Sequence, residues 1–282
     1  MTTPIVLTWL SYLTPDNNTT RGCNYVKSMK SLIGLQDVNL VLVDNDPTQS
    51  LLLDTVRAEI GLGCYESRDK TPQSYQVFRA KNEWVDVAAH YVAYYVARAW
   101  NRPYFAYTYD DFVFYDKFWV KDAVSFMDKN PDVCCIRMPR YNAHHKDLFD
   151  RDITPKWTNP ESVAHHRGGV KNTDVAHSDF EVVGGHEFYK SNWRPQSRPT
   201  LWRTDDFARI VGFPNPCPVM QEFEGYMHAF ADLDDSYVSG FINRGVCETF
   251  SQDTSARLAA GNKFPEVDLT SLEESVRLVY GF

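Results

Sequence analysis

The sequence lacks several patterns, and each absence excludes a class of protein. Its 282 residues contain no run of eighteen apolar residues, so no membrane-spanning helix is expected. No basic segment precedes the short apolar run at 4–10, which argues against a secretory leader. We therefore expect a soluble cytoplasmic protein without a signal peptide or transmembrane segment, in the host cytoplasm if the chain is viral.

The sequence also lacks the short motifs of several enzyme classes. It has no P-loop and no G-x-S-x-G, and Gly61-Leu-Gly63 is only a fragment of a dinucleotide fingerprint. A Rossmann-type oxidoreductase is therefore disfavoured. The six cysteines include no C-x-x-C pair and no zinc spacing, so we expect buried free thiols in a reducing compartment.

Positive charge is scarce, and its distribution is uneven. The formal net charge of -8 argues against a nonspecific nucleic-acid coat. Residues 137–209 nevertheless hold 12 Lys and Arg against 10 Asp and Glu, with six of the eight histidines. This middle segment suits an anionic partner, although a solvated surface of mixed charge explains it equally well.

The first half of the chain alternates strand and helix patterns. Continuous apolar runs are typical of strands buried on both faces, and apolar residues at three-and-four spacing are typical of amphipathic helices. This alternation predicts an α/β fold in which helices flank a mostly parallel central sheet. In chain order we expect a strand at 4–10, a helix at 22–35, a strand at 39–43 and a helix at 83–100. A strand at 104–109, a helix at 117–128 and a strand at 133–138 follow.

The second half is less regular. Residues 139–180 have few periodic apolar positions and many loop formers, so we expect an irregular excursion over one face of the sheet. We interpret 1–138 and 139–282 as two halves of a single domain. The remaining predicted elements are a strand at 180–189, helices at 204–211 and 221–232, a strand at 246–250 and a weakly helical tail.

Two adjacent carboxylates, Asp110 and Asp111, follow the strand at 104–109. In open parallel sheets, ligands bind beyond the carboxyl ends of the strands. Adjacent carboxylates repel each other, and a hard divalent cation bound with substrate phosphates relieves that repulsion. The alternative is a simple helix cap. A second acidic cluster, Asp44-Asn-Asp46, closes the strand at 39–43, and we expect it on the same edge of the sheet.

Two segments carry a resemblance to a known enzyme family: Val41-Leu-Val-Asp-Asn-Asp-Pro-Thr48 and Tyr107-Thr-Tyr-Asp-Asp-Phe-Val-Phe114. In order and spacing, residues 4–138 resemble the GT-A nucleotide-sugar glycosyltransferases, particularly the family-two type. Phe112 stands where that family often has a third Asp. The resemblance implies a GT-A (Rossmann-like) fold and a metal-dependent hexosyl- or pentosyltransferase. Such an enzyme uses Mn²⁺ or Mg²⁺ to move a sugar from a nucleotide-diphosphate donor, such as a UDP-sugar, to a hydroxyl acceptor.

The resemblance also implies roles for single residues. Asp44 would bind the nucleobase, Asp110 would lie beside the ribose or diphosphate, and Asp111 would be the direct metal ligand. Thr8 on the first strand would join the nucleotide-sugar site. Within Met220-Gln-Glu-Phe-Glu-Gly-Tyr226, either Glu222 or Glu224 would be the catalytic base. The Glu-Asp pair typical of the family is missing there, so the base and the inverting outcome stay open.

The acceptor stays open between a glycan, a small molecule and DNA. A phage-type DNA glycosyltransferase would act on a flipped-out hydroxymethyl pyrimidine, supported by aromatic and Arg side chains. A different class is an inactive GT-A-like module that only binds a nucleotide or a partner. Candidate supporting residues are Trp157, Trp193, Arg194 and Trp202 for a flipped base, Arg167, Lys171 and Arg203 for the diphosphate, and His177 and His186 for the divalent site.

Overall fold

The computed structural model describes eight segments of the chain, 4–11, 21–44, 75–79, 87–139, 178–191, 198–210, 237–249 and 269–280. Up to residue 137 their elements follow the predicted alternation of strand and helix, but the strands at 75–79, 200–203 and 238–242 were not predicted. In chain order they are β1 (Ile5–Ser11), α1 (Arg21–Leu32), β2 (Val38–Asp44), β3 (Tyr75–Arg79), α3 (Val87–Ala99), β4 (Tyr104–Tyr109), β5 (Phe112–Phe114), α4 (Trp119–Lys129), β6 (Val133–Arg137), β7 (Glu181–Val183), β8 (His186–Ser191), β9 (Thr200–Arg203), α7 (Thr204–Ile210), β10 (Val238–Ile242), β11 (Cys247–Thr249) and α10 (Leu269–Tyr280).

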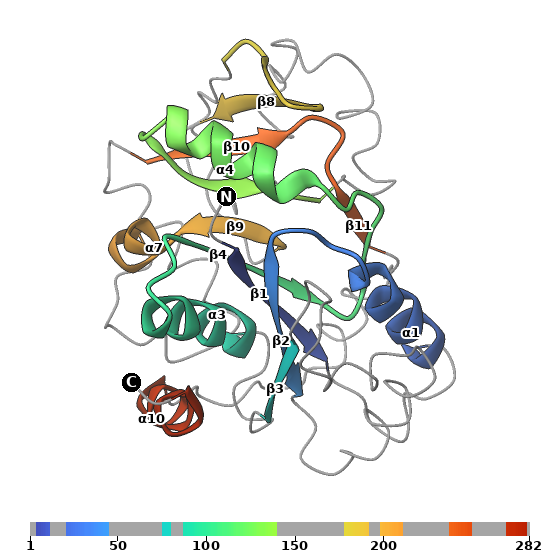
Figure 1. Ribbon diagram of the computed structural model, residues 1–282, viewed down its shortest axis with the longest axis vertical. Helices are drawn as coiled ribbons and strands as arrows, with labels where there is room; N and C mark the ends of the chain where they lie inside the picture. Colours follow the sequence, from blue (N-terminus) through green and yellow to red (C-terminus); the bar gives the residue numbers. More distant parts are fainter. Residues whose placement is uncertain are drawn as a thin grey trace, which may run out of the picture.

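A mixed sheet organises these segments (Figure 1). Its described strands lie in the order β3-β2-β1-β4-β9-β6-β10-β8-β7. The four strands from β3 to β4 are parallel, as are β6 and β10. β9 runs antiparallel to both β4 and β6, and β8 and β7 extend the far edge as antiparallel strands. The predicted α/β class with a central parallel sheet is confirmed.

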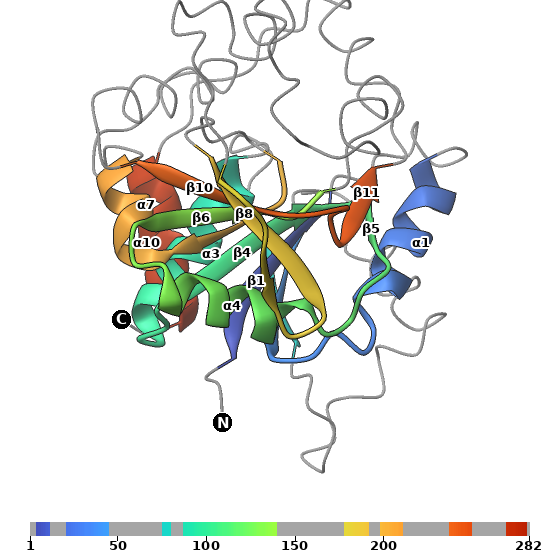
Figure 2. The same ribbon diagram turned by 90° about the horizontal axis from the view of Figure 1, so that it is seen from above.

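Apolar side chains cover both faces of the sheet. Along β1, Val6 and Leu10 join a core with α3, α7 and α10, while Ile5, Leu7 and Trp9 join a second core with α1 and α4. This alternation follows from the two-residue period of a strand. In Figure 2, α3, α7 and α10 group together away from α1. β1 is therefore a strand buried on both faces, as its continuous apolar run predicted.

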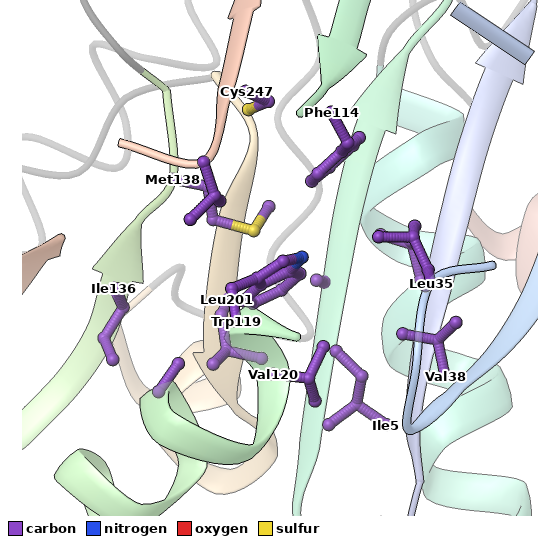
Figure 3. Close-up of a cluster of buried hydrophobic side chains, with 14 of the residues drawn as sticks. Ile5, Leu35, Val38, Phe114, Trp119, Val120, Ile136, Met138, Leu201 and Cys247 are labelled. Atoms are coloured by element: carbon purple, nitrogen blue, oxygen red, sulfur yellow. The ribbon is translucent and has the colours of Figure 1, made fainter. Parts of the chain in front are cut away.

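The second core lies between the sheet and α4 (Figure 3). Ile5 of β1, Leu201 of β9 and the α4 residues Trp119 and Val120 are each at most 2% exposed. Burying each such side chain contributes about 1.5–3 kcal/mol. Cys247 closes this core as a buried free thiol. Cys134 and Cys135 of β6 are also buried and free, which confirms the prediction of unpaired thiols for these positions.

Two predicted elements differ from the structure. The single strand expected at 180–189 is a hairpin, because β7 and β8 are joined at Gly184 and Gly185. Gly184 has φ +61°, a left-handed conformation that suits glycine in a tight turn. Residues 112–114 form a short strand of their own, β5, which pairs with β11 in a small separate sheet. The predicted helix at 221–232 and most of the excursion at 139–180 lie outside the described residues.

The described helices are short. Among them, none has both the length and the apolar character that crossing a membrane requires.

Candidate functional site

The acidic residues that follow or end two strands lie at the same carboxyl edge of the sheet. In the parallel register, Ser11 of β1 lies beside Asp44 of β2, and Leu10 lies beside Tyr109 of β4. Asp110 follows Tyr109 directly. Because neighbouring strands are ~4.8 Å apart, β2 and β4 are separated by about 10 Å across β1. The two acidic strand ends therefore share one edge, as the sequence predicts, while the roles of these residues stay predictions.

The acidic turn, Tyr109 to Phe112, is anchored by α1. Ser28 Oγ accepts a hydrogen bond of 2.9 Å from Trp9 Nε1 and donates one of 2.5 Å to the backbone oxygen of Phe112. One helical turn later, Ser31 Oγ accepts a 3.0 Å bond from the backbone N–H of Phe114. Both serines are buried. The helix thus fixes the backbone on which Asp110 and Asp111 sit.

A buried histidine supports the same turn from the other face of the sheet. His90 in the first turn of α3 lies with Nε2 2.6 Å from the Tyr109 hydroxyl, and its ring centroid is 3.7 Å from that of Tyr107. Complete burial lowers the pKa of His90 to about 3, so the ring is neutral at pH 7. Neither His90 nor Ser28 stands out in the sequence as a site residue. His90 therefore acts on the turn through Tyr109 and not as a charge.

Thr8 and Asp44 lie deeper than the acidic turn. Thr8 is fully buried and its hydroxyl donates a 2.7 Å hydrogen bond to the backbone oxygen of Ala89, which joins β1 to the start of α3. Asp44 is 3% exposed and lies in register with Ser11 on one side and Arg79 on the other. Their predicted contacts with a nucleotide stay predictions.

The small sheet brings a late part of the chain to the acidic turn. In it, Thr249 lies opposite Phe112 and Cys247 lies opposite Phe114. Burial raises the pKa of the Cys247 thiol well above its usual value, and the negative charges of Asp111 and Glu248 raise it further. Asp111 directly precedes Phe112, so the acidic turn lies at the end of the small sheet. Both turn carboxylates belong to partly exposed residues.

The carboxylates of the acidic turn fit a hard divalent cation. In the described segments, no group of three or more His, Cys, Asp or Glu side chains forms a complete metal cluster. Mg²⁺ does not require one, because it usually takes one or two protein carboxylates and fills its other positions with water and substrate phosphates. Asp110 and Asp111 supply oxygen donors of this type on an anchored turn.

Three residues that the sequence suggested for this site lie elsewhere. His186 has Nδ1 2.9 Å from Asp122 and Nε2 2.9 Å from Asp116, so both ring nitrogens are engaged away from Asp111. β9 runs antiparallel to β4, which places Arg203 opposite Tyr104 at the amino end of that strand. Trp202 is fully buried in the core and cannot stack on a flipped base. Eight further candidates from the sequence lie outside the described residues: Glu222, Glu224, Trp157, Arg167, Lys171, His177, Trp193 and Arg194.

Comparison with solved structures identifies the fold. The 1–349 segment of S. aureus TarS aligns with 97% of this chain and 69% of its own, with a TM-score of 0.50 and 11% identity. Glucosyl-3-phosphoglycerate synthase from Mycobacterium tuberculosis, in complex with Mn²⁺, UDP and phosphoglyceric acid, covers 99% of this chain and 79% of its own (TM-score 0.48, 11% identity). Mouse xyloside xylosyltransferase 1 covers 80% and 71% (TM-score 0.38, 9% identity).

These neighbours are GT-A nucleotide-sugar glycosyltransferases. Together with the strand order, the likeness to TarS shows that this chain has a GT-A-like fold. No protein-family model matches the sequence, and no curated protein matches it either.

Proposed function

We propose that this protein is a metal-dependent glycosyltransferase that moves a sugar from a nucleotide-diphosphate donor to a hydroxyl acceptor. One observation carries the proposal: Asp44 and the acidic turn lie on one carboxyl edge of three adjacent parallel strands. In open α/β sheets this edge is where ligands bind. The GT-A-like fold supports the proposal, because nucleotide-sugar transferases share it.

In this proposal each acidic residue has a distinct task. Asp44 contacts the nucleobase, Asp110 lies beside the ribose or diphosphate, and Asp111 holds Mn²⁺ or Mg²⁺. When bound, the cation supplies Lewis-acid stabilisation of the charge on the leaving diphosphate. Ser28 and His90 keep the acidic turn in place, so Asp111 need not reorganise when the donor binds.

A carboxylate must also take the proton of the acceptor hydroxyl if the reaction inverts the anomeric centre. We propose Glu222 or Glu224 for this task, and a positioned general base contributes roughly 10²–10⁴-fold to the rate. Glu222→Gln and Glu224→Gln, each measured for transfer and for donor hydrolysis, identify the base as the variant that loses that factor in kcat. Equal activity in both variants and the unmodified protein would exclude both residues.

A thermal-shift panel of nucleoside diphosphates and their sugars, with and without Mn²⁺, tests the site directly. We expect one nucleotide to raise Tm only when Mn²⁺ is present. Asp111→Asn should abolish this shift while leaving the Tm of the free protein within a few degrees. Asp179→Asn removes the same charge at an exposed residue away from the acidic turn and should retain the full shift. A Mn²⁺-dependent shift that persists in Asp111→Asn would contradict the metal assignment.

Turnover separates an enzyme from a binding module. We expect the protein to hydrolyse its preferred nucleotide sugar slowly with Mn²⁺, and a comparison of UDP-glucose with UDP-xylose tests hexosyl against pentosyl transfer. A protein that binds the sugar nucleotide with Mn²⁺ but neither hydrolyses nor transfers it would be an inactive module instead.

A further inference from the structure

A histidine lies between two carboxylates at the turn of the β7–β8 hairpin, beside α4 (Figure 2). His186 Nδ1 is 2.9 Å from Asp122 Oδ2, in the first turn of α4. On the other side of the ring, His186 Nε2 is 2.9 Å from Asp116 Oδ2, in the loop between β5 and α4. One side chain therefore links three segments of the chain: the hairpin, the helix and the loop.

The two contacts of His186 require two protons on its ring. A neutral imidazole has one N–H and one acceptor nitrogen, whereas the protonated ring has two N–H groups. An ionised carboxylate only accepts hydrogen bonds. A neutral His186 can therefore donate to Asp116 or to Asp122 but not to both, and its other nitrogen would face a carboxylate oxygen with no proton between them. The protonated ring satisfies both 2.9 Å contacts.

The two carboxylates differ in how firmly they are held. Asp122 belongs to a helix, its side chain is 17% exposed, and its Oδ2 also accepts a 2.8 Å hydrogen bond from the Gly185 N–H. Asp116 belongs to a loop, its side chain is 31% exposed, and its Oδ1 accepts a 2.7 Å bond from the Phe118 N–H. Asp116 is therefore the carboxylate that can turn to water when the ring has only one proton.

The remaining charged side chains on the segments around His186 have other partners or face solvent. They are Glu187 with Asn243, Lys190 with Asp132, Glu181 with Lys129, Asp128 with Tyr104, Lys117 with the Ser31 backbone oxygen, and the exposed Lys121 and Arg244. Val183, which lies opposite His186 on β7, carries no charge. Among the described residues, the charged groups that contact the ring are thus Asp116 and Asp122.

We propose that His186 is a pH-dependent clasp between the hairpin and the loop that leads from β5 to α4. The protonated ring binds Asp122 and Asp116 together. Histidine side chains gain or lose a proton between about pH 5 and 8, and a ring that has lost one keeps Asp122 and releases Asp116. β5 directly follows the acidic turn, so the released loop is one short strand away from that turn. This inference does not depend on the proposed function.

NMR spectroscopy of the whole chain tests the clasp, with the Phe118 and Gly185 amides as reporters of Asp116 and Asp122. We expect the Phe118 resonance to shift between pH 5 and 8 on the same titration curve as the His186 ring, and the Gly185 resonance to shift less. Both ring nitrogens should carry protons at pH 5, and Nδ1 alone at pH 8. His186→Gln should abolish the Phe118 transition. His90→Gln is the control, because it removes a histidine that contacts neither carboxylate, and it should retain the transition.

Asp116→Asn provides a second test that keeps the histidine. An Asn amide can donate to the unprotonated Nε2, so the bridge no longer needs a second proton on the ring. The Phe118 resonance of this variant should therefore move much less between pH 5 and 8. A Phe118 resonance that stays constant in the unmodified protein, or that moves equally in His186→Gln, would overturn the clasp. A ring that keeps its single proton on Nε2 at pH 8 would overturn the release of Asp116.

Discussion

Ser28 is a single hydroxyl on which both the core and the acidic turn depend. It accepts from the buried Trp9 indole and donates to Phe112, so Ser28→Ala leaves a buried donor unsatisfied. We expect a loss of about 1–3 kcal/mol in the free energy of unfolding, measured in urea. Ser178→Ala is the control, because that hydroxyl also makes two hydrogen bonds but is exposed. An equally large loss in both variants would contradict this account.

His90 makes the stability of the protein depend on pH. Its pKa is about 3 in the folded state and about 6.5 when unfolded, so between these values the unfolded chain binds more protons. The contribution of His90 to the free energy of unfolding is therefore largest above pH 6.5. It falls as the pH decreases, by at most about 1.4 kcal/mol per pH unit. His90→Gln keeps a polar group beside Tyr109 but does not titrate. Urea unfolding between pH 4 and 6 gives the free energy of unfolding at each pH. Its increase per pH unit should be lower in His90→Gln than in the unmodified protein by about that amount.

An unchanged pH slope in His90→Gln would mean that His90 is not buried as a neutral ring. The same variant should retain Mn²⁺-dependent nucleotide binding if the Gln amide still holds the Tyr109 hydroxyl.

At residue scale, the acidic site candidates are visible in the sequence, but the residues that hold the acidic turn in place are not. Asp44, Asp110 and Asp111 stand out because carboxylates interrupt apolar strand ends. Ser28 gives no such signal, since a serine on a helix looks the same whether it faces solvent or a distant turn. His90 left a weak signal, because it is the only histidine among the alanine, valine and tyrosine residues of the buried run from Ala89 to Ala97, but its partner Tyr109 is far away in sequence.

The turn of the β7–β8 hairpin contacts α4 through the Asp122 carboxylate. Asp122 Oδ2 on α4 accepts from the Gly185 N–H at 2.8 Å and lies 2.9 Å from His186 Nδ1. A Cβ at Gly184 would lie 2.1 Å from Asp122 Oδ1, and its φ of +61° adds strain for any other residue. Gly184→Ala should therefore displace Asp122 and break both contacts.

We expect Gly184→Ala to lower the free energy of unfolding by more than about 2 kcal/mol, of which the left-handed backbone accounts for roughly 1–2. Gly185→Ala is a matched control, because a Cβ there meets no atom within 4 Å, and its effect should stay within about 0.5 kcal/mol. Chemical denaturation of both variants measures the difference. Equal stabilities would show that the hairpin does not depend on Asp122.

At the scale of the whole molecule, β9 joins the two halves of the chain. It lies between β4 and β6, although it follows them in sequence, and it hydrogen-bonds to both. Without β9, the first half has a gap in the middle of its sheet. We expect the 1–138 fragment to stay unfolded by circular dichroism and the full chain to unfold in one cooperative transition. A folded 1–138 fragment would contradict this prediction.

The sequence predicted the first half of the fold well and the second half less well. Continuous apolar strands and a strongly periodic helix identified β1, β2, β4 and α3 within a few residues. The place of β9 could not be predicted, because four residues contain no information about which distant strands they pair with. The Gly184-Gly185 turn was missed because the apolar pattern continues through it, although paired glycines are a recognised turn signal.

The position of β9 also constrains the order of events during synthesis. The strands on either side of it emerge from the ribosome first, and they cannot be bridged until residue 203 has been translated. At roughly 5–20 residues per second, the nascent chain waits for several seconds with the edges of β4 and β6 uncovered. During that interval the unpaired edges are open to pairing with strands of other chains, so aggregation is the hazard that β9 removes once it inserts.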